Sequence, residues 1–307
     1  MRSNLKMSSR RGLSLVEIMV ALVLLGIVAT GIMTVIMRQQ QFYRSATEVI
    51  DTRSQIRQAA AVVPVDIRGV SSVSGDILNM SDSSLDVRGN IGSGLICSHT
   101  ANSVTIPPIN LANGRYFTTF LTRPKVSDVF MILDDKAAGN QDDDWAVPYV
   151  IASIDSTTIG CTSFTDVAAD AGKYRYVYTF TTNLSPTIVD GAPLRMARGV
   201  KYSIYKSASD GLWWMGYREC RGDGSSCDAV QPVSGPYKPY VPNDTINSGV
   251  SFVYRDSTGA ITANKANVAR VELFIHGQTQ GAVALGGGKS KPYSDYMKVT
   301  IALRNRQ

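Results

Sequence analysis

One long apolar segment near the N-terminus constrains the fold of this chain more than any other feature. Residues 13–37 are 25 consecutive positions at which Glu17 is the only ionisable side chain. At a rise of about 1.5 Å per residue, a helix of this length exceeds the roughly 30 Å hydrocarbon core of a bilayer. The apolar region of a cleavable secretory signal is shorter, about 7 to 15 residues, and ends in small residues. We therefore predict a membrane-spanning helix over residues 13–37.

The positive charge of the chain is concentrated before this segment. The 31 Lys and Arg exceed the 25 Asp and Glu by six, and four of these cations are Arg2, Lys6, Arg10 and Arg11. Without them the net charge falls from +6 to +2 (6 − 4), so charge gives no support for nucleic-acid binding. The positive-inside bias places residues 1–12 in the cytoplasm and everything after residue 37 on the other side of the membrane.

The helical pattern continues beyond the apolar segment. Apolar or small residues recur at spacings typical of a helix as far as Val63, and no proline occurs before Pro64, the first strong helix breaker. The simplest interpretation is one helix of about 50 residues with a membrane half at 13–37 and an outer half at 38–66. A helix of this length needs a partner for its apolar stripe, which we expect to be a sheet of the same domain and neighbouring copies.

Residues 67–307 show the alternation typical of β-strands. Segments such as 271–276 and 295–303 alternate apolar and polar residues, and turn sequences such as "SDG" and "DSTG" separate strand patterns. Residues 71–94 are rich in Ser, Gly and Asp, which predicts a loop or a weak strand. The expected fold class is α+β, with a long N-terminal α-helix packed on a mostly antiparallel β-sheet C-terminal domain.

Four cysteines follow the apolar segment: Cys97, Cys161, Cys220 and Cys227. An even number in a translocated domain indicates disulfides formed in an oxidising compartment. Of the three possible pairings, we favour Cys220–Cys227, which flank the polar loop "RGDGSS", together with Cys97–Cys161. The alternative is that the cysteines are free and buried.

The start of the apolar segment carries a specific order of residues. A basic leader is followed by Gly12, Leu13, Ser14, two apolar residues and Glu17. This order resembles the prepilin signature of the type IV pilin superfamily. The resemblance implies that prepilin peptidase cuts after Gly12 on the cytoplasmic face and that the new N-terminal residue, Leu13, is methylated. Leu13 differs from the phenylalanine that is frequent at this position in the family.

The resemblance also implies a role for Glu17, the fifth residue after the cut. A carboxylate in lipid costs about 2–3 kcal/mol, and less near the interface. The new ammonium group lies about 6 Å from Glu17 along the helix axis. When subunits pack with an axial offset, a neighbour's ammonium can pair with Glu17 and set the register of the helices. The alternative is a plain signal anchor whose charged group reaches water at the interface.

Three further segments extend the resemblance more faintly. "DIRGV" at residues 66–70 and the C-terminal "VARVELFI" and "ALRNRQ" resemble PilW-type minor pilins and the related J-type pseudopilins of type II secretion. The resemblance implies a non-catalytic minor pilin that assembles into or primes a type IV pilus near its tip. Because the outermost tip subunit of this family often lacks the carboxylate, the presence of Glu17 implies a position just below the top.

The same resemblance implies location and partners. The chain is expected in the inner membrane with its N-terminus in the cytoplasm, and then in the pilus or at the cell surface, with the C-terminal domain in the periplasm or outside. The expected partners are major and minor pilins, prepilin peptidase, the inner-membrane assembly platform and, before assembly, the lipid bilayer. We expect no nucleic acid. The alternatives are a J-type pseudopilin, a DNA-uptake pilus subunit and a signal-anchored periplasmic enzyme.

Candidates for chemistry are few. His99 and His276 are the only histidines, and neither has neighbours at a spacing that indicates a nucleophile–histidine pair or a zinc site. We therefore predict no enzymatic activity and no cofactor. Clustered carboxylates could bind calcium, although their spacing does not fit an EF-hand and a solvated turn is the alternative. The candidates are Asp134, Asp135, Asp142, Asp143 and Asp144.

Overall fold

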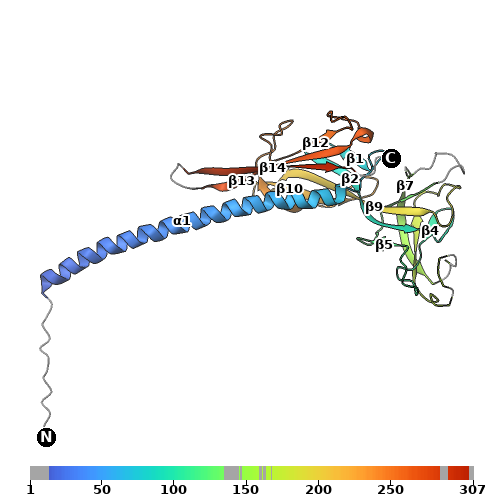
Figure 1. Ribbon diagram of the computed structural model, residues 1–307, viewed down its shortest axis with the longest axis horizontal. Helices are drawn as coiled ribbons and strands as arrows, with labels where there is room; N and C mark the ends of the chain where they lie inside the picture. Colours follow the sequence, from blue (N-terminus) through green and yellow to red (C-terminus); the bar gives the residue numbers. More distant parts are fainter. Residues whose placement is uncertain are drawn as a thin grey trace, which may run out of the picture. The chain divides into compact units, whose positions relative to one another are not determined.

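The structure is a computed structural model, and it describes residues 14–134, 145, 147–158, 161, 164–166, 168–283 and 290–303. One long helix, α1 (Leu15–Ile67, 53 residues), opens the described chain (Figure 1). This confirms the predicted single helix. Pro64, however, does not end it, and α1 continues to Ile67 before Arg68 N donates to the Pro64 carbonyl at 3.1 Å. A proline in the last turn removes only one helical N–H and leaves few residues beyond it to distort.

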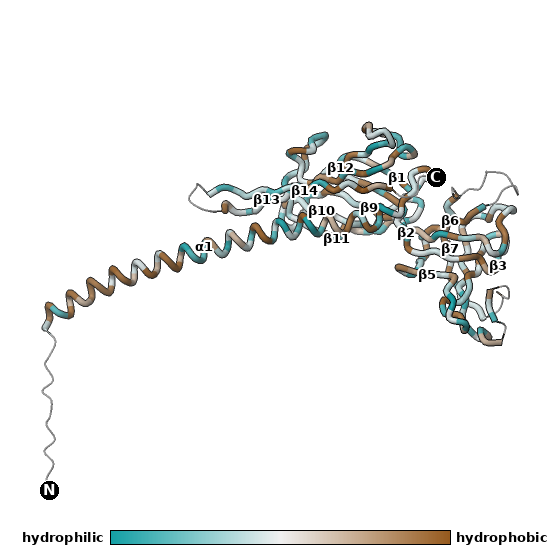
Figure 2. The backbone as a smooth tube through the Cα atoms, viewed as in Figure 1, coloured by the Kyte–Doolittle hydropathy of each residue, from teal (hydrophilic) through white to brown (hydrophobic). Residues whose placement is uncertain are grey.

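The first part of α1 is exposed and apolar. Every residue from Leu15 to Arg44 is exposed, and Figure 2 shows mostly hydrophobic residues along this stretch. Among the described residues, α1 is the one helix long and apolar enough to cross a membrane. An apolar surface of this extent needs lipid or other helices around it.

The chain divides into two compact units. One joins α1 up to Asp51 with Thr279–Tyr293, and the other contains Thr52–Gln278 together with the chain from Ser294 onward. In the first unit, Glu48 of α1 accepts a hydrogen bond from the backbone N–H of Gly281 at 3.2 Å. The second unit holds the remaining turns of α1 and most of the sheet.

The strands of the described chain form an antiparallel sheet, as predicted. Their order is β12-β13-β11-β10-β9-β6-β7-β8-β4-β3, with β14 on β13, β2 on β9, and β1 and β5 on β2. The strands and one short 3-10 helix are β1 (Ile77–Met80), β2 (Ser84–Leu95), β3 (Ser98–His99), β4 (Ser103–Thr105), β5 (Thr119–Phe120), β6 (Val129–Ile132), β7 (Pro148–Thr157), β8 (Arg175–Phe180), β9 (Pro193–Lys206), β10 (Trp213–Cys220), β11 (Gln231–Tyr237), β12 (Val250–Arg255), η1 (Lys265–Asn267), β13 (Arg270–Val283) and β14 (Lys291–Ala302).

The outer half of α1 packs on one part of this sheet. Ile56, Ala59, Val63 and Ile67 share a buried core with strands β1, β2 and β9 to β14. Their spacing of three or four residues places them on one face of the helix. A second buried core lies farther along β2 and β9, where β4, β6, β7 and β8 join them.

The prediction of a loop or weak strand over residues 71–94 holds for residues 71–76 and 81–83, which are turns or irregular, but not for the long strand that follows them. Residues 84–95 form β2, which pairs with β9 from Ser84–Ser203 to Leu95–Pro193 and occupies an inner position in the sheet. Its glycines, which suggested a loop, meet close neighbours. A Cβ on Gly92 would lie 2.6 Å from the Thr119 carbonyl oxygen of β5. Tertiary contact therefore outweighs the low strand propensity of glycine at this position.

Candidate functional site

The start of α1 is held by a reciprocal pair of hydrogen bonds between Ser14 and Glu17. The Glu17 backbone N–H donates to Ser14 Oγ at 3.2 Å, and the Ser14 backbone N–H donates to Glu17 Oε2 at 3.4 Å. This is a capping box, in which two backbone donors at a helix N-terminus are satisfied reciprocally. Glu17 therefore stabilises the first turn of its own helix.

This local role of Glu17 is not among those predicted above from the sequence. The pattern Ser-x-x-Glu before an apolar run is a readable signature of a capping box, and it stands at residues 14–17. The charge of Glu17 also lies in the first turn of α1, where the helix dipole favours an anion. A local role thus exists beside the predicted pairing with a neighbouring subunit, and the two must be separated by experiment.

The surface of α1 beyond Glu17 leaves room for close neighbours. A Cβ placed on Gly26 or Gly31 would meet nothing within 4 Å. The hydroxyl groups of Thr30 and Thr34 donate to the carbonyls of Gly26 and Thr30 at 2.7 and 2.8 Å, so these polar groups are satisfied within the helix. Small residues at such positions let helix backbones approach closely in a membrane.

Several predicted site residues lie outside the described residues. Gly12 and Leu13, the predicted cleavage and methylation positions, are among them, as are the leader residues 1–12. The same is true of Asp135, Asp142, Asp143 and Asp144 of the calcium candidate. Asp134 is described, is buried, and accepts a hydrogen bond from Thr187 Oγ1 at 2.5 Å.

The other end of α1 is fixed to the sheet through Asp66. The Tyr202 hydroxyl on β9 donates to Asp66 Oδ2 at 2.7 Å. Burial raises the pKa of the Asp66 carboxyl above its ordinary value, and the hydrogen bond from Tyr202 offsets only part of this effect. Asp66 thus joins the last turns of the helix to a central strand.

Both disulfides that the sequence favours are present in the structure. Cys97 is bonded to Cys161 and Cys220 to Cys227, with sequence separations of 64 and 7 residues. Within the described residues, no group of three or more His, Cys, Asp or Glu side chains could hold a metal ion. His99 Nδ1 lies 2.6 Å from Asp190 Oδ1, and His276 is buried on β13.

Comparison with known proteins identifies the N-terminal region. Residues 7–33 match the family described as Prokaryotic N-terminal methylation motif. This match spans Gly12, Leu13, the capping box and the first turns of α1. No curated protein and no solved structure matches the chain.

The motif indicates a type IV pilin-like or pseudopilin protein. It implies processing by prepilin peptidase and interaction with other pilins, and together with the apolar helix it is consistent with membrane anchoring.

Proposed function

We propose that this protein is a minor pilin of the PilW type, a non-catalytic structural subunit that assembles into or primes a type IV pilus. The observation that carries the proposal is the methylation motif at residues 7–33, which leads directly into a long, exposed apolar helix. A subunit of this kind is cleaved between Gly12 and Leu13 and methylated on Leu13. Its helix then leaves the inner membrane and packs among the helices of neighbouring pilins.

The arrangement of charge at the start of α1 supports this proposal. Cleavage creates an ammonium group at Leu13, four residues before Glu17. Glu17 lies on the exposed surface of the helix, so a neighbouring subunit can reach its carboxylate. Pairing of this carboxylate with a neighbour's ammonium removes part of the cost of two charges in lipid and sets the axial offset. We place the subunit just below the tip of the pilus, since it retains this carboxylate.

The decisive experiment is identification of the mature N-terminal residue. The full chain is produced in cells with active or inactivated prepilin peptidase, purified from membranes and analysed by mass spectrometry. We expect N-methyl-Leu13 at the N-terminus in the first case and the uncleaved leader in the second. A chain that keeps residues 1–12 in the presence of active peptidase would contradict the proposal.

A matched pair of glycine variants makes the test specific. Gly12→Val adds an isopropyl side chain at the proposed cleavage site and should leave the leader attached. Gly26→Val makes the same change farther along α1, where a Cβ meets nothing within 4 Å, and should be cleaved normally. Location near the tip is tested separately by immunogold labelling of the C-terminal domain, which should mark pilus ends and not their full length.

A further inference from the structure

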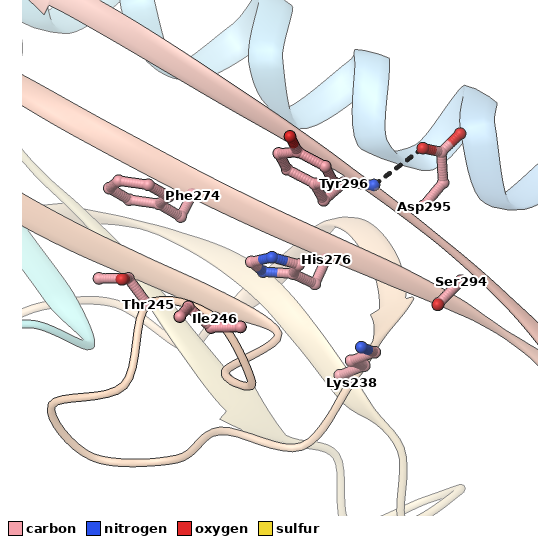
Figure 3. Close-up of a pocket in the computed structure, with 8 residues that line it drawn as sticks. All are labelled: Lys238, Thr245, Ile246, Phe274, His276, Ser294, Asp295 and Tyr296. Atoms are coloured by element: carbon pink, nitrogen blue, oxygen red, sulfur yellow. Dashed lines mark hydrogen bonds between the residues drawn. The ribbon is translucent and has the colours of Figure 1, made fainter.

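A groove on the second unit is built from segments that are far apart in the sequence. It has a volume of about 610 Å³ and lies between the β13–β14 pair and the loop that follows β11 (Figure 3). Phe274 and His276 of β13 and Tyr296 of β14 line one part of it, and Lys238, Thr245 and Ile246 line another. This volume is within the range of about 300–1,000 Å³ that is typical of ligand sites.

The loop that forms one wall of the groove is held firmly. Both of its ends form backbone hydrogen bonds with His276 of β13. The Lys238 N–H donates to the His276 carbonyl at 3.1 Å, and the His276 N–H donates to the Gly249 carbonyl at 2.6 Å. Within the loop, Asp244 Oδ1 accepts hydrogen bonds from the N–H groups of Ile246 and Asn247 at 2.8 and 2.9 Å. The wall is therefore formed before any partner arrives.

The groove presents apolar side chains to solvent. Ile246 is 74% exposed and Tyr296 is 68% exposed. The Tyr296 ring stacks on His276 with 5.7 Å between ring centroids, which fixes one face of the tyrosine. Phe274, half-buried, lies beneath the Lys298 ammonium at 5.1 Å. These exposed apolar side chains are available for contact with a partner.

Charge in the groove is unevenly matched. Asp295 is paired with Arg53 at 3.1 Å, and Lys298 with Glu272 at 2.9 Å. Lys238, by contrast, has no side-chain hydrogen bond or ion pair with any residue that the structure describes. An occupant that carries a carboxylate would supply the partner that Lys238 lacks.

We propose that this groove docks a segment of a neighbouring protein subunit in which an apolar side chain stands next to a carboxylate. The apolar side chain lies between Ile246 and Tyr296, and the carboxylate pairs with Lys238. Ile246 and Tyr296 are each more than two-thirds exposed, so these two side chains cover one side of an occupant only. This suits a side chain presented by a larger protein, because pockets for free small molecules typically bury about 70–90% of the ligand. The inference goes beyond the proposed function and does not depend on cleavage of the leader.

The test uses the full chain in detergent micelles with isoleucine methyl groups labelled for NMR. Three probes are titrated: acetyl-Phe-Asp-amide, its neutral counterpart acetyl-Phe-Asn-amide, and phenylacetate as a free small acid. We expect the Ile246 methyl signal to shift saturably with the acidic peptide and to require about fivefold more of the neutral peptide, as for the loss of one partly exposed ion pair. Ile261, 72% exposed on another loop, should not move.

Lysine variants assign the effect to the groove. Lys238→Gln should abolish the preference for the acidic peptide, whereas Lys206→Gln, at the exposed end of β9, should preserve it. Equal binding of the two peptides, or equal shifts at Ile246 and Ile261, would overturn the proposal. Phenylacetate that binds as tightly as the acidic peptide would identify a free acid as the occupant and would equally refute docking of a protein segment.

Discussion

Glu17 is placed to serve two roles, and a pair of substitutions separates them. Glu17→Gln removes the charge but keeps an amide that can complete the capping box with Ser14. Ser14→Ala removes the Oγ atom that accepts the Glu17 N–H at 3.2 Å, and it leaves the charge in place. If the charge sets the register between subunits, only the first change should impair assembly.

The two substitutions should reduce incorporation into pili by clearly different factors. Glu17→Gln leaves a neighbour's ammonium without a partner, and breaking a buried ion pair in this way costs about 3–5 kcal/mol. Because the site lies near the membrane interface, we use the lower value of about 3 kcal/mol. A loss of this size should reduce incorporation about 100-fold. Loss of a helix cap costs about 1 kcal/mol. The capping box is present in both the free and the assembled subunit, so this cost largely cancels, and Ser14→Ala should change incorporation less than about threefold.

The assay compares the amount of each variant in sheared pili with the amount left in the membrane, by quantitative immunoblot. Mass spectrometry must first show that both variants carry the mature N-terminus, since a failure of cleavage would also prevent assembly. Full incorporation of Glu17→Gln would refute the register argument. An equal loss with Ser14→Ala would show that the first turn of the helix, and not the charge, is what assembly requires.

Three further predictions concern the folded domain. Val63→Ala, at a fully buried position in α1, should lower the free energy of unfolding in urea by about 2–3 kcal/mol, whereas Val65→Ala, 73% exposed, should change it by less than about 0.5 kcal/mol. The raised pKa of Asp66 means that the folded state binds the proton of this carboxyl more tightly than the unfolded state does. The stability of wild type relative to Asp66→Asn should therefore fall as pH rises from the ordinary pKa of 3.8 through the raised pKa of the folded state. Urea midpoints at each pH measure this difference. Removing the Cys97–Cys161 disulfide, which closes a separation of 64 residues, should lower the free energy of unfolding by about 4 kcal/mol. Removing the Cys220–Cys227 disulfide, with its separation of 7 residues, should lower it by about 2.5 kcal/mol. Both values are measured by denaturation under oxidising conditions.

The helix could be predicted because its signals are local. A long stretch without proline and with a regular apolar face specifies α1 almost to its end, and Pro64 is tolerated because it falls in the last turn. For residues 84–95 the sequence leaves open whether a strand or a loop forms. The Ser and Gly residues of this segment suit a loop by propensity, and only pairing with β9 and β5 explains why Gly92 stands in a strand.

The candidate sites also differ in whether their residues lie close together in the sequence. Gly12, Leu13 and Glu17 form a continuous pattern, so their proposed roles can be read from the order of residues alone. The capping box is equally local, because Ser14 and Glu17 stand three residues apart in the sequence. The groove has no sequence signal, since Lys238, Ile246 and Tyr296 meet only when β11, β13 and β14 come together. Sites assembled by long-range pairing require a structure.

The two roles of Glu17 are compatible at the level of atoms. The capping box uses Oε2, and within the described residues Oε1 has no hydrogen-bond partner, so a neighbour's ammonium can approach the second oxygen while the first stays bonded. Fixing a free glutamate side chain costs up to about 2 kcal/mol of conformational entropy. Because the hydrogen bond to Ser14 already restricts the carboxylate to the first turn, only part of this entropy is lost on assembly. A small loss of incorporation with Ser14→Ala, within the threefold limit, would therefore measure preorganisation of the carboxylate, whereas the loss with Glu17→Gln would measure the ion pair itself.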